Sequence, residues 1–148
     1  MSAELLFDIC GKLVLPAWAL LIFLPKWKWS TTLVSHAWIP ALLGVCYIYC
    51  FYNGYPSPEG SGFGSLAQVM VLFQTPYFAL AGWIHYLAFD LFIGAWEVRD
   101  AQRHKLNHLL VVPCLLLTFL AGPVGLLLYF IVRAFKSRSL STVERSIA

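Results

Sequence analysis

Charged residues are scarce in this chain of 148 residues: Asp, Glu, Lys and Arg make up 11% of it, and hydrophobic residues make up 60%. Soluble domains are about 25% charged and about 45–50% apolar. The shortage of charge therefore excludes an ordinary soluble domain and predicts an integral membrane protein. The net charge of +3 is too small and too dispersed to indicate a nucleic-acid-binding protein.

The beginning of the chain also lacks the features of a cleavable signal peptide. Glu4 and Asp8 stand where such a peptide has a basic region, and no A-x-A-like site follows a short apolar core. We therefore expect the first apolar segment to be retained.

C-x-x-C pairs are absent as well, although the chain has four cysteines. All of them lie in apolar stretches, and nothing nearby supplies the spacing of a metal site. We expect them to be small buried thiols. They are Cys10, Cys46, Cys50 and Cys114.

Apolar runs are plentiful, and four segments are long enough for a spanning helix, which needs about 20 mainly apolar residues. Pro76 divides the longest run because proline lacks the N–H that a helix interior requires. The segment 53–65, rich in Gly, Pro and Ser, is the clearest loop. The sequence predicts an all-α, integral membrane four-helix bundle that forms a single domain over residues 1–148. The spans are expected at about 5–24, 32–52, 76–96 and 109–132, with 66–75 as an interfacial or bent lead-in and 121–125 as a kink.

Four antiparallel spans place both termini on one side of the membrane. The basic residues are then divided equally between the two sides, so the positive-inside rule does not choose an orientation. Lys12 falls within the first span, and Arg145 is remote from the last one. We therefore expect the short links after the first and third spans to be cytoplasmic.

The stretch WIHYLAFDLF, residues 83–92, carries a histidine and an aspartate inside the third expected span. An Asp there costs about 2.5–3.5 kcal/mol on insertion, so such groups usually face a protein interior and often have a function. His85 and Asp90 are separated by about 140° around a helix and cannot form one local pair. A hydrogen bond to a neighbouring helix is the structural alternative for His85, whereas Asp90 requires a cation, several donors or a proton.

A second polar group follows in the link EVRDAQRHKLNH, residues 97–108. Asp100, His104 and His108 recur every four residues, and Glu97 joins the same stripe if the link is helical. Carboxylate and imidazole groups could bind a divalent cation there. Asp100 and His108 could hold one metal only if the link bends or if His104 bridges them, because two helical turns separate them by about 12 Å. A solvated helix end of mixed charge is the alternative, and it requires no bend.

The start of the second span, the end of the third and the start of the fourth share one side of the predicted bundle. We therefore expect His36 to approach Asp90 or His108. We also expect His85, Asp90, Asp100 and His108 to point into the bundle.

Tryptophans mostly fall near the expected span ends, as is typical of interfacial anchors. The alternative is that some of them line a cavity for a long apolar ligand together with four tyrosines. These are Tyr47, Tyr49, Tyr77 and Tyr86.

Four segments resemble, in order, the landmarks of the abscisic-acid-deficient-4-like (neoxanthin synthase-like) membrane proteins. They are VLPAWALLIFLPK (14–26), IPALLGVCY (39–47), WIHYLAFDLF (83–92) and GPVG (122–125). Plant plastid members of this family are implicated in making neoxanthin from violaxanthin. The resemblance covers most of the chain. The sequence lacks the plastid transit peptide and the longer second loop of the plant members, so we expect a bacterial or cyanobacterial relative in an inner or thylakoid membrane.

The resemblance also implies site residues. His85 and Asp90 match the polar pair of the third span, Asp100 the aspartate of the following link, and His108 the histidine that opens the fourth span. The plant members differ between Glu97 and Asn107, so the resemblance does not support a role for His104. Violaxanthin need not be the substrate.

The implied reaction opens a carotenoid 5,6-epoxide to an allene and needs an acid at the epoxide oxygen and a base at an adjacent C–H. His85, Asp90, Asp100 and His108 are the catalytic candidates. A divalent metal held by Asp100 and His108 is the Lewis-acid variant.

The expected partners are a carotenoid or another long isoprenoid and the membrane lipid. The alternative is a non-catalytic membrane pigment-binding or assembly factor, in which the same residues stabilise the bundle. An ion or proton pathway has less support because only the third span carries clear ionisable residues.

Overall fold

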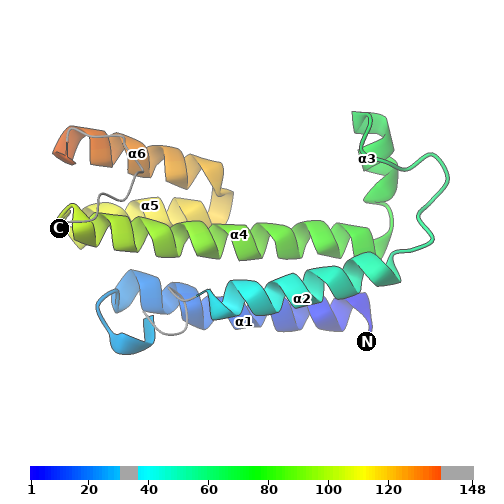
Figure 1. Ribbon diagram of the computed structural model, residues 1–148, viewed down its shortest axis with the longest axis horizontal. Coiled ribbons are helices and arrows are strands. Elements are labelled where there is room, and N and C mark those ends of the chain that lie inside the picture. The colour runs from blue at the N-terminus through cyan, green and yellow to red at the C-terminus, as the bar shows by residue number, and fades with distance from the viewer. Residues whose placement is uncertain (31–36, 138–148) are drawn as a thin grey trace, which may run out of the picture.

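The computed structural model describes residues 1–30 and 37–137, which form six helices and no strand (Figure 1). The all-α class is confirmed, but the helices are six rather than the four expected. They are α1 (Ala3–Phe23), α2 (Trp38–Asn53), α3 (Leu66–Leu72), α4 (Pro76–Arg103), α5 (His108–Ala121) and α6 (Pro123–Ser137). His36 lies outside the described residues.

The central element is α4, whose 28 residues extend for about 42 Å. It begins with Pro76 in its first turn, where the missing N–H has no helical partner to lose. Helices α1 and α2 pack along one side of α4, and α5 and α6 cover part of its other side (Figure 1). Close packing of α1 on α4 depends on Gly94, because a Cβ there would lie 2.7 Å from the Trp18 ring.

The single helix expected over residues 109–132 is wrong, because the chain reverses at Gly122. Gly122 ends α5 with φ 37°, a backbone conformation that glycine adopts without a Cβ penalty. Pro123 then begins α6. A Cβ at Gly125 would lie 2.0 Å from the backbone nitrogen of Thr118, so α5 and α6 pack backbone to backbone. The structure therefore has a helical hairpin where the sequence predicted a kink.

The reversal changes the relation between the two ends of the chain. Helix α6 returns to the end of the molecule where α4 finishes, whereas Ala3 lies at the opposite end (Figure 1). An ion pair of 3.0 Å between Arg133 Nε and Asp100 Oδ2 joins the ends of α6 and α4. The expectation that both termini share one side is therefore wrong for the described residues.

The lead-in expected over residues 66–75 consists of the short helix α3 and a turn. The Ser65 hydroxyl accepts a hydrogen bond from the backbone N–H of Gln68 and caps the start of α3. Helix α3 stands across the end of α4 where α4 begins (Figure 1). Helix α3 therefore lies next to the first turns of α4.

Two of the described helices, α1 and α4, are long and apolar enough to cross a membrane. Helices α2 and α5 are apolar but shorter. All four cysteines are free thiols; Cys46 is half-buried, and Cys10, Cys50 and Cys114 are buried.

Candidate functional site

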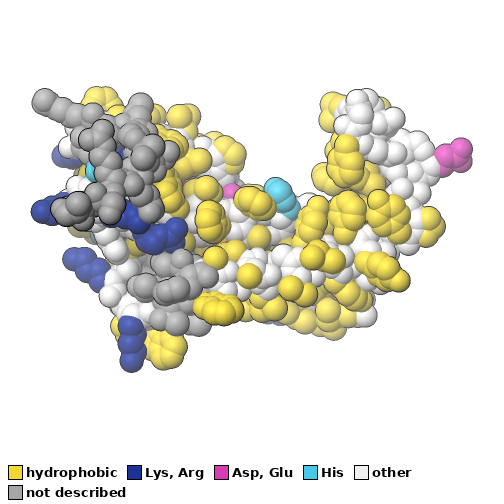
Figure 2. All heavy atoms as spheres, in the orientation of Figure 1, with side chains coloured by type: hydrophobic (Ala, Val, Ile, Leu, Met, Phe, Trp, Pro, Cys, Tyr) yellow, Lys and Arg dark blue, Asp and Glu magenta, His cyan; other side chains and the backbone are white. Residues whose placement is uncertain are grey.

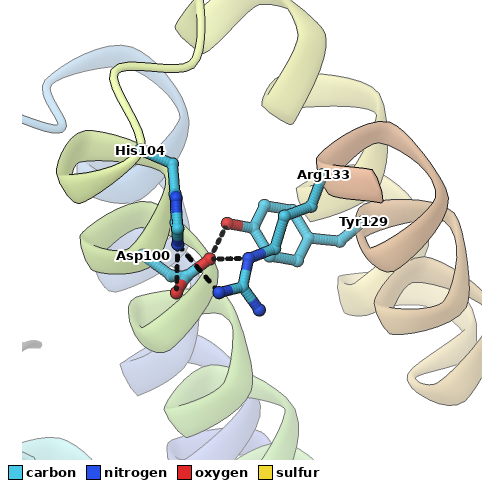
Figure 3. A network of polar contacts seen from close by, with 4 residues as sticks. All are labelled: Asp100, His104, Tyr129 and Arg133. Atoms are coloured by element: carbon cyan, nitrogen blue, oxygen red, sulfur yellow. Dashed lines mark hydrogen bonds and ion pairs between the residues drawn. The ribbon is translucent and has the colours of Figure 1, made fainter. Parts of the chain in front are cut away.

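A buried charged network joins the last turns of α4 to α6 (Figure 3). The Tyr129 hydroxyl donates a hydrogen bond of 2.5 Å to Asp100 Oδ2, which also pairs with Arg133 Nε. Arg133 Nη2 lies 2.8 Å from His104 Nε2. Because arginine can only donate, His104 Nε2 accepts this bond. Arg133 is only 1% exposed. The opposite charge of Asp100 and the hydrogen bonds of the network compensate for the loss of water around this buried ion pair.

One turn before Asp100, a second carboxylate is buried against the hairpin. The Thr118 hydroxyl contacts both carboxylate oxygens of Glu97, at 3.0 and 3.2 Å. Glu97 is fully buried. Glu97, Asp100 and His104 therefore share the face of α4 that meets α5 and α6, as the spacing in the sequence indicated.

Sequence reasoning missed the partners of this stripe, which are Thr118, Tyr129 and Arg133. A single span over 109–132 would have carried Arg133 to the opposite side of the membrane. The signal that could have found them is the Gly122–Pro123 pair, which permits a reversal, followed by a tyrosine and an arginine four residues apart on one face of a helix.

His108 opens α5 as expected, but its partner lies on α1. His108 Nε2 is 2.9 Å from the backbone oxygen of Ile22, near the end of α1. The carbonyl oxygens of the last helical turn lack partners within their own helix. His108 therefore ties the start of α5 to the end of α1.

The link between α4 and α5 does bend, as a shared metal site on Asp100 and His108 would require. The two side chains nevertheless have different partners: Asp100 faces Tyr129 and Arg133, and His108 faces Ile22. The described residues contain no group of three or more His, Cys, Asp or Glu side chains that could hold a metal ion. The guanidinium of Arg133 already supplies the positive charge beside Asp100, so this arrangement does not fit a metal shared by Asp100 and His108.

Asp90 is half-buried and packs against the turn of the hairpin. A Cβ on Gly122 would lie 2.7 Å from Asp90 Oδ1, so a side chain at this position would require the carboxylate to move. Asp90 Oδ2 is buried and has no hydrogen-bond partner among the residues that the structure describes. The Tyr86 hydroxyl, one turn earlier on α4, lies beside the Asp90 carboxylate but donates its proton to the backbone oxygen of Phe119. A buried carboxylate oxygen without a partner is costly, which marks Asp90 as a candidate for function.

His85 points outward, so the expectation that all four candidates point into the bundle is wrong for it. Its side chain is exposed, and its ring stacks on Phe89 with centroids 4.4 Å apart. The Tyr47 ring lies 6.3 Å away. Figure 2 shows a hollow over the middle of α4, between α3 and the α5–α6 hairpin, with histidine on its floor.

His85 belongs to the lining of a groove of about 500 Å³ formed by α2, α3, α4 and the loop before α3. We call it the aromatic groove. It is lined by Tyr47, Phe51, Phe63, Leu72, Phe73, Phe78, Ala79, Ala81, Gly82, Trp83, His85 and Tyr86. The alternative that four tyrosines and some tryptophans line a cavity is met only in part: Tyr47, Tyr86 and Trp83 belong to the lining, whereas Tyr49 and Tyr77 do not and contact Met1 instead. The ligand of this groove stays a prediction.

The four sequence candidates therefore occupy separate places on the molecule. His85 lies in the aromatic groove, Asp90 at the hairpin turn, Asp100 in the charged network, and His108 at the end of α1. The structure does not gather them into one site, and their catalytic roles stay predictions.

A family model described as ABA DEFICIENT 4-like matches residues 5–129. This chain belongs to the ABA DEFICIENT 4-like family. The resemblance seen in the sequence is thereby confirmed. Comparison with curated proteins gave no match, and neither did comparison with solved structures.

The ABA DEFICIENT 4-like segment includes the aromatic groove and all four sequence candidates. It ends at Tyr129, so the contact between Tyr129 and Asp100 lies inside the segment that defines the family. Arg133 lies beyond it. The hairpin turn at Gly122, with Asp90 against it, is also part of the family segment.

Proposed function

We propose that this ABA DEFICIENT 4-like protein is embedded in a membrane, binds a carotenoid or another long isoprenoid in the aromatic groove, and isomerises it. The observation that carries the proposal is an open groove lined by aromatic side chains, with His85 in its lining and the partly buried Asp90 further along the same helix. Asp90 follows His85 by five residues, about 7.5 Å of helix rise.

The outer surface supports placement in a membrane. Large apolar side chains are exposed along α2, including Val45 and Ile48, which are 64% and 67% exposed. Similar side chains are exposed on α1 and α4, among them Phe7, Ile9 and Phe89. Soluble monomers rarely expose contiguous apolar patches larger than a few hundred Å². Lipid chains would cover these faces without cost.

The size and lining of the groove support a long apolar ligand. Sites for small molecules usually enclose about 300–1,000 Å³ and are mainly apolar with a few polar groups. The aromatic groove has about 500 Å³, with His85 and the tyrosine hydroxyls as its polar groups. The apolar end ring of such a ligand and the start of its flat polyene can pack against these aromatic rings, and the open side lets the rest of the chain extend into lipid.

Opening an epoxide to an allene needs one proton donor and one proton acceptor. The donor gives a proton to the epoxide oxygen as its C–O bond breaks, and the acceptor removes a proton from the neighbouring carbon, so no oxidant is consumed. Asp90 suits proton exchange because its Oδ2 has no described partner. His85 suits it because its ring lies in the groove. Asp100 and His108 have protein partners, and we assign them structural roles.

Non-catalytic pigment binding is the second candidate function. The observation that favours it is the separation of the two groups: His85 is exposed in the groove, and Asp90 packs against Gly122. Under this alternative the groove binds the ligand, and Asp90 only packs against the turn of the hairpin.

A groove-filling variant tests ligand binding. A Cβ at Gly82 would lie 3.2 Å from the Phe73 ring, so Gly82→Leu fills the groove. A Cβ at Gly44 would meet nothing within 4 Å, so Gly44→Leu is the matched control. We expect purified Gly82→Leu protein to bind an added epoxycarotenoid at least about tenfold more weakly, with Gly44→Leu close to the parent. Equal binding by both variants would contradict the groove assignment.

Chromatography of the bound pigment separates the two candidate functions. Conversion of the epoxycarotenoid by the parent protein, lost in His85→Gln while binding persists, supports isomerisation. Tight binding by the parent without any product supports the pigment-binding alternative.

A further inference from the structure

Positive charge is concentrated at one end of the molecule. Every described Lys and Arg except Lys12 follows the end of α1 or lies in the last turns of α4 and α6 or the link after α4. These residues are Lys26, Lys28, Arg99, Arg103, Lys105, Arg133 and Lys136. Figure 2 shows the Lys and Arg side chains at the end where α4 and α6 finish. We call this the basic end.

Contacts between distant segments hold the basic end together. Gln102 Nε2 donates a hydrogen bond of 3.0 Å to the backbone oxygen of Pro25, which joins the end of α4 to the link after α1. Arg133 joins α6 to α4 through Asp100. The exposed basic residues therefore belong to one surface, although they come from three parts of the sequence, and the buried Arg133 holds α6 in place beneath it.

The exposed acidic residues that the structure describes lie at the other end of the molecule. At the basic end, Glu97 and Asp100 are buried and present no negative charge on the surface. The end where α1 and α4 begin carries Glu4 and Asp8, and Glu59 is exposed in the loop before α3. The remaining described cation, Lys12, pairs with Asp8 at 2.9 Å. The two ends of the molecule therefore differ in sign.

The link after α1 adds exposed indole rings to the basic end. Trp27 and Trp29 are 46% and 44% exposed, and Lys26 and Lys28 alternate with them. The Lys28 ammonium lies 5.5 Å from the centre of the Trp29 ring. Indole rings collect at the boundary between lipid chains and headgroups, and ammonium groups beside them reach the headgroup phosphates.

We propose that the basic end is a docking surface for anionic lipid headgroups and that it therefore faces the cytoplasm. The proposal rests on the membrane placement given above. The N-terminal end and the loop over 54–65 then lie on the opposite side. Helices α1 and α4 cross the bilayer, α2 returns the chain between them, and the α5–α6 hairpin enters from the cytoplasmic face and returns to it.

The reversal at Gly122 gathers the basic residues on one side of the molecule, and the positive-inside rule can then assign that side. A fourth complete span would have carried Arg133 and Lys136 to the side opposite Lys26 and Lys28. The hairpin instead brings them to the same side, and the excess of Lys and Arg near short links marks the cytoplasmic side. Anionic headgroups of that leaflet attract such residues, and salt weakens the attraction.

Cysteine labelling from outside spheroplasts tests the orientation. Ser57 and Lys136 are exposed, at the loop and at the basic end respectively, whereas the native cysteines are buried or half-buried. We expect Ser57→Cys to react with an impermeant maleimide in intact spheroplasts and Lys136→Cys to react only after lysis, each compared with the parent protein. The reverse pattern, or labelling of both sites from one side, would overturn the proposal. Extraction of the chain from membranes by alkaline carbonate would instead overturn the membrane placement itself.

Nanodiscs of phosphatidylglycerol and of phosphatidylcholine test the docking surface. We expect the parent protein to unfold at a higher temperature in phosphatidylglycerol, with the difference reduced by high salt. The variant in which Lys26, Lys28, Lys105 and Lys136 are all Gln should lose most of this difference. Lys12→Gln, at the other end, should keep it. An equal lipid effect in both variants would overturn the proposal.

Discussion

At the scale of single residues, Asp90 has the least satisfied environment among the candidates. Its Oδ2 is buried without a described hydrogen-bond partner, and its Oδ1 touches the turn at Gly122. A carboxylate in this position either takes part in proton transfer or only lowers the stability of the fold. Replacing it with the amide of the same shape distinguishes the two.

We expect Asp90→Asn to remain folded and to lose isomerisation, because an amide keeps the shape of the side chain but cannot exchange a proton in this way. Product formation per bound pigment is the measurement, with pigment binding as the control. Unchanged product yield in Asp90→Asn would contradict a proton-transfer role and leave Asp90 as a structural residue.

Arg133 and Asp100 are expected to depend on each other. Removing one member of a buried ion pair leaves an uncompensated charge and costs about 3–5 kcal/mol. We therefore expect Arg133→Met to lower the unfolding temperature strongly. The double variant Arg133→Met with Asp100→Asn should recover most of the loss, because no buried charge is then left alone. Equal destabilisation by the single and double variants would show that the ion pair is not what Arg133 contributes.

At the scale of helices, the hairpin depends on the absence of a side chain at Gly125. A Cβ there would lie 2.0 Å from the Thr118 nitrogen, so Gly125→Ala must push α5 and α6 apart. We expect this variant to be destabilised by at least about 2 kcal/mol, the upper range of overpacking costs. Gly44→Ala is the control, since a Cβ there meets nothing within 4 Å and alanine favours a helix by about 0.5–1 kcal/mol. Thermal unfolding in one detergent compares the two, and similar behaviour would contradict the close packing.

The helices could be predicted where local signals were sufficient. Pro76 begins α4 as expected, and α1 overlaps the first expected span. The reversal at Gly122 could not be predicted, because a Gly-Pro pair is compatible with a kink and with a turn. The contact of Gly125 with Thr118 and the pairing of Arg133 with Asp100 decide between them, and both are tertiary contacts.

The same limit applies to the candidate site. Helical spacing correctly placed Asp100 and His104 on one face of α4. It could not indicate that His85 points outward, because a helix that is apolar on all sides does not show in its sequence which face meets lipid and which meets protein.

At the scale of the whole molecule, the hairpin is too short to cross a bilayer. The 14 residues of α5 extend for about 21 Å, and the hydrocarbon core is about 30 Å thick. With the proposed membrane placement, the turn at Gly122 should therefore end inside the membrane. Leu120, beside the turn, is 70% exposed on the outside of the hairpin and would face lipid chains.

We expect a fluorophore on Leu120→Cys to be quenched by nitroxides attached deep in the lipid chains and to be protected from a water-soluble quencher. Leu109, which is 76% exposed at the start of α5, provides the control position and should show the opposite preference. Quenching of the Leu120 label by the aqueous reagent would mean that the turn reaches a membrane surface.

The length of α4 has a consequence for the membranes that suit this protein. Its apolar part, Pro76 to Trp96, extends for about 31 Å, close to the thickness of the hydrocarbon core, whereas Asp100 in the last turns and His104 just after the helix lie beyond it. A thicker bilayer must thin around the protein or draw the Asp100–Arg133 pair into hydrocarbon, and both responses cost free energy. Hydrophobic mismatch would thus act on the contact that fastens the hairpin, so the thickness of the surrounding bilayer becomes a determinant of whether the hairpin stays closed.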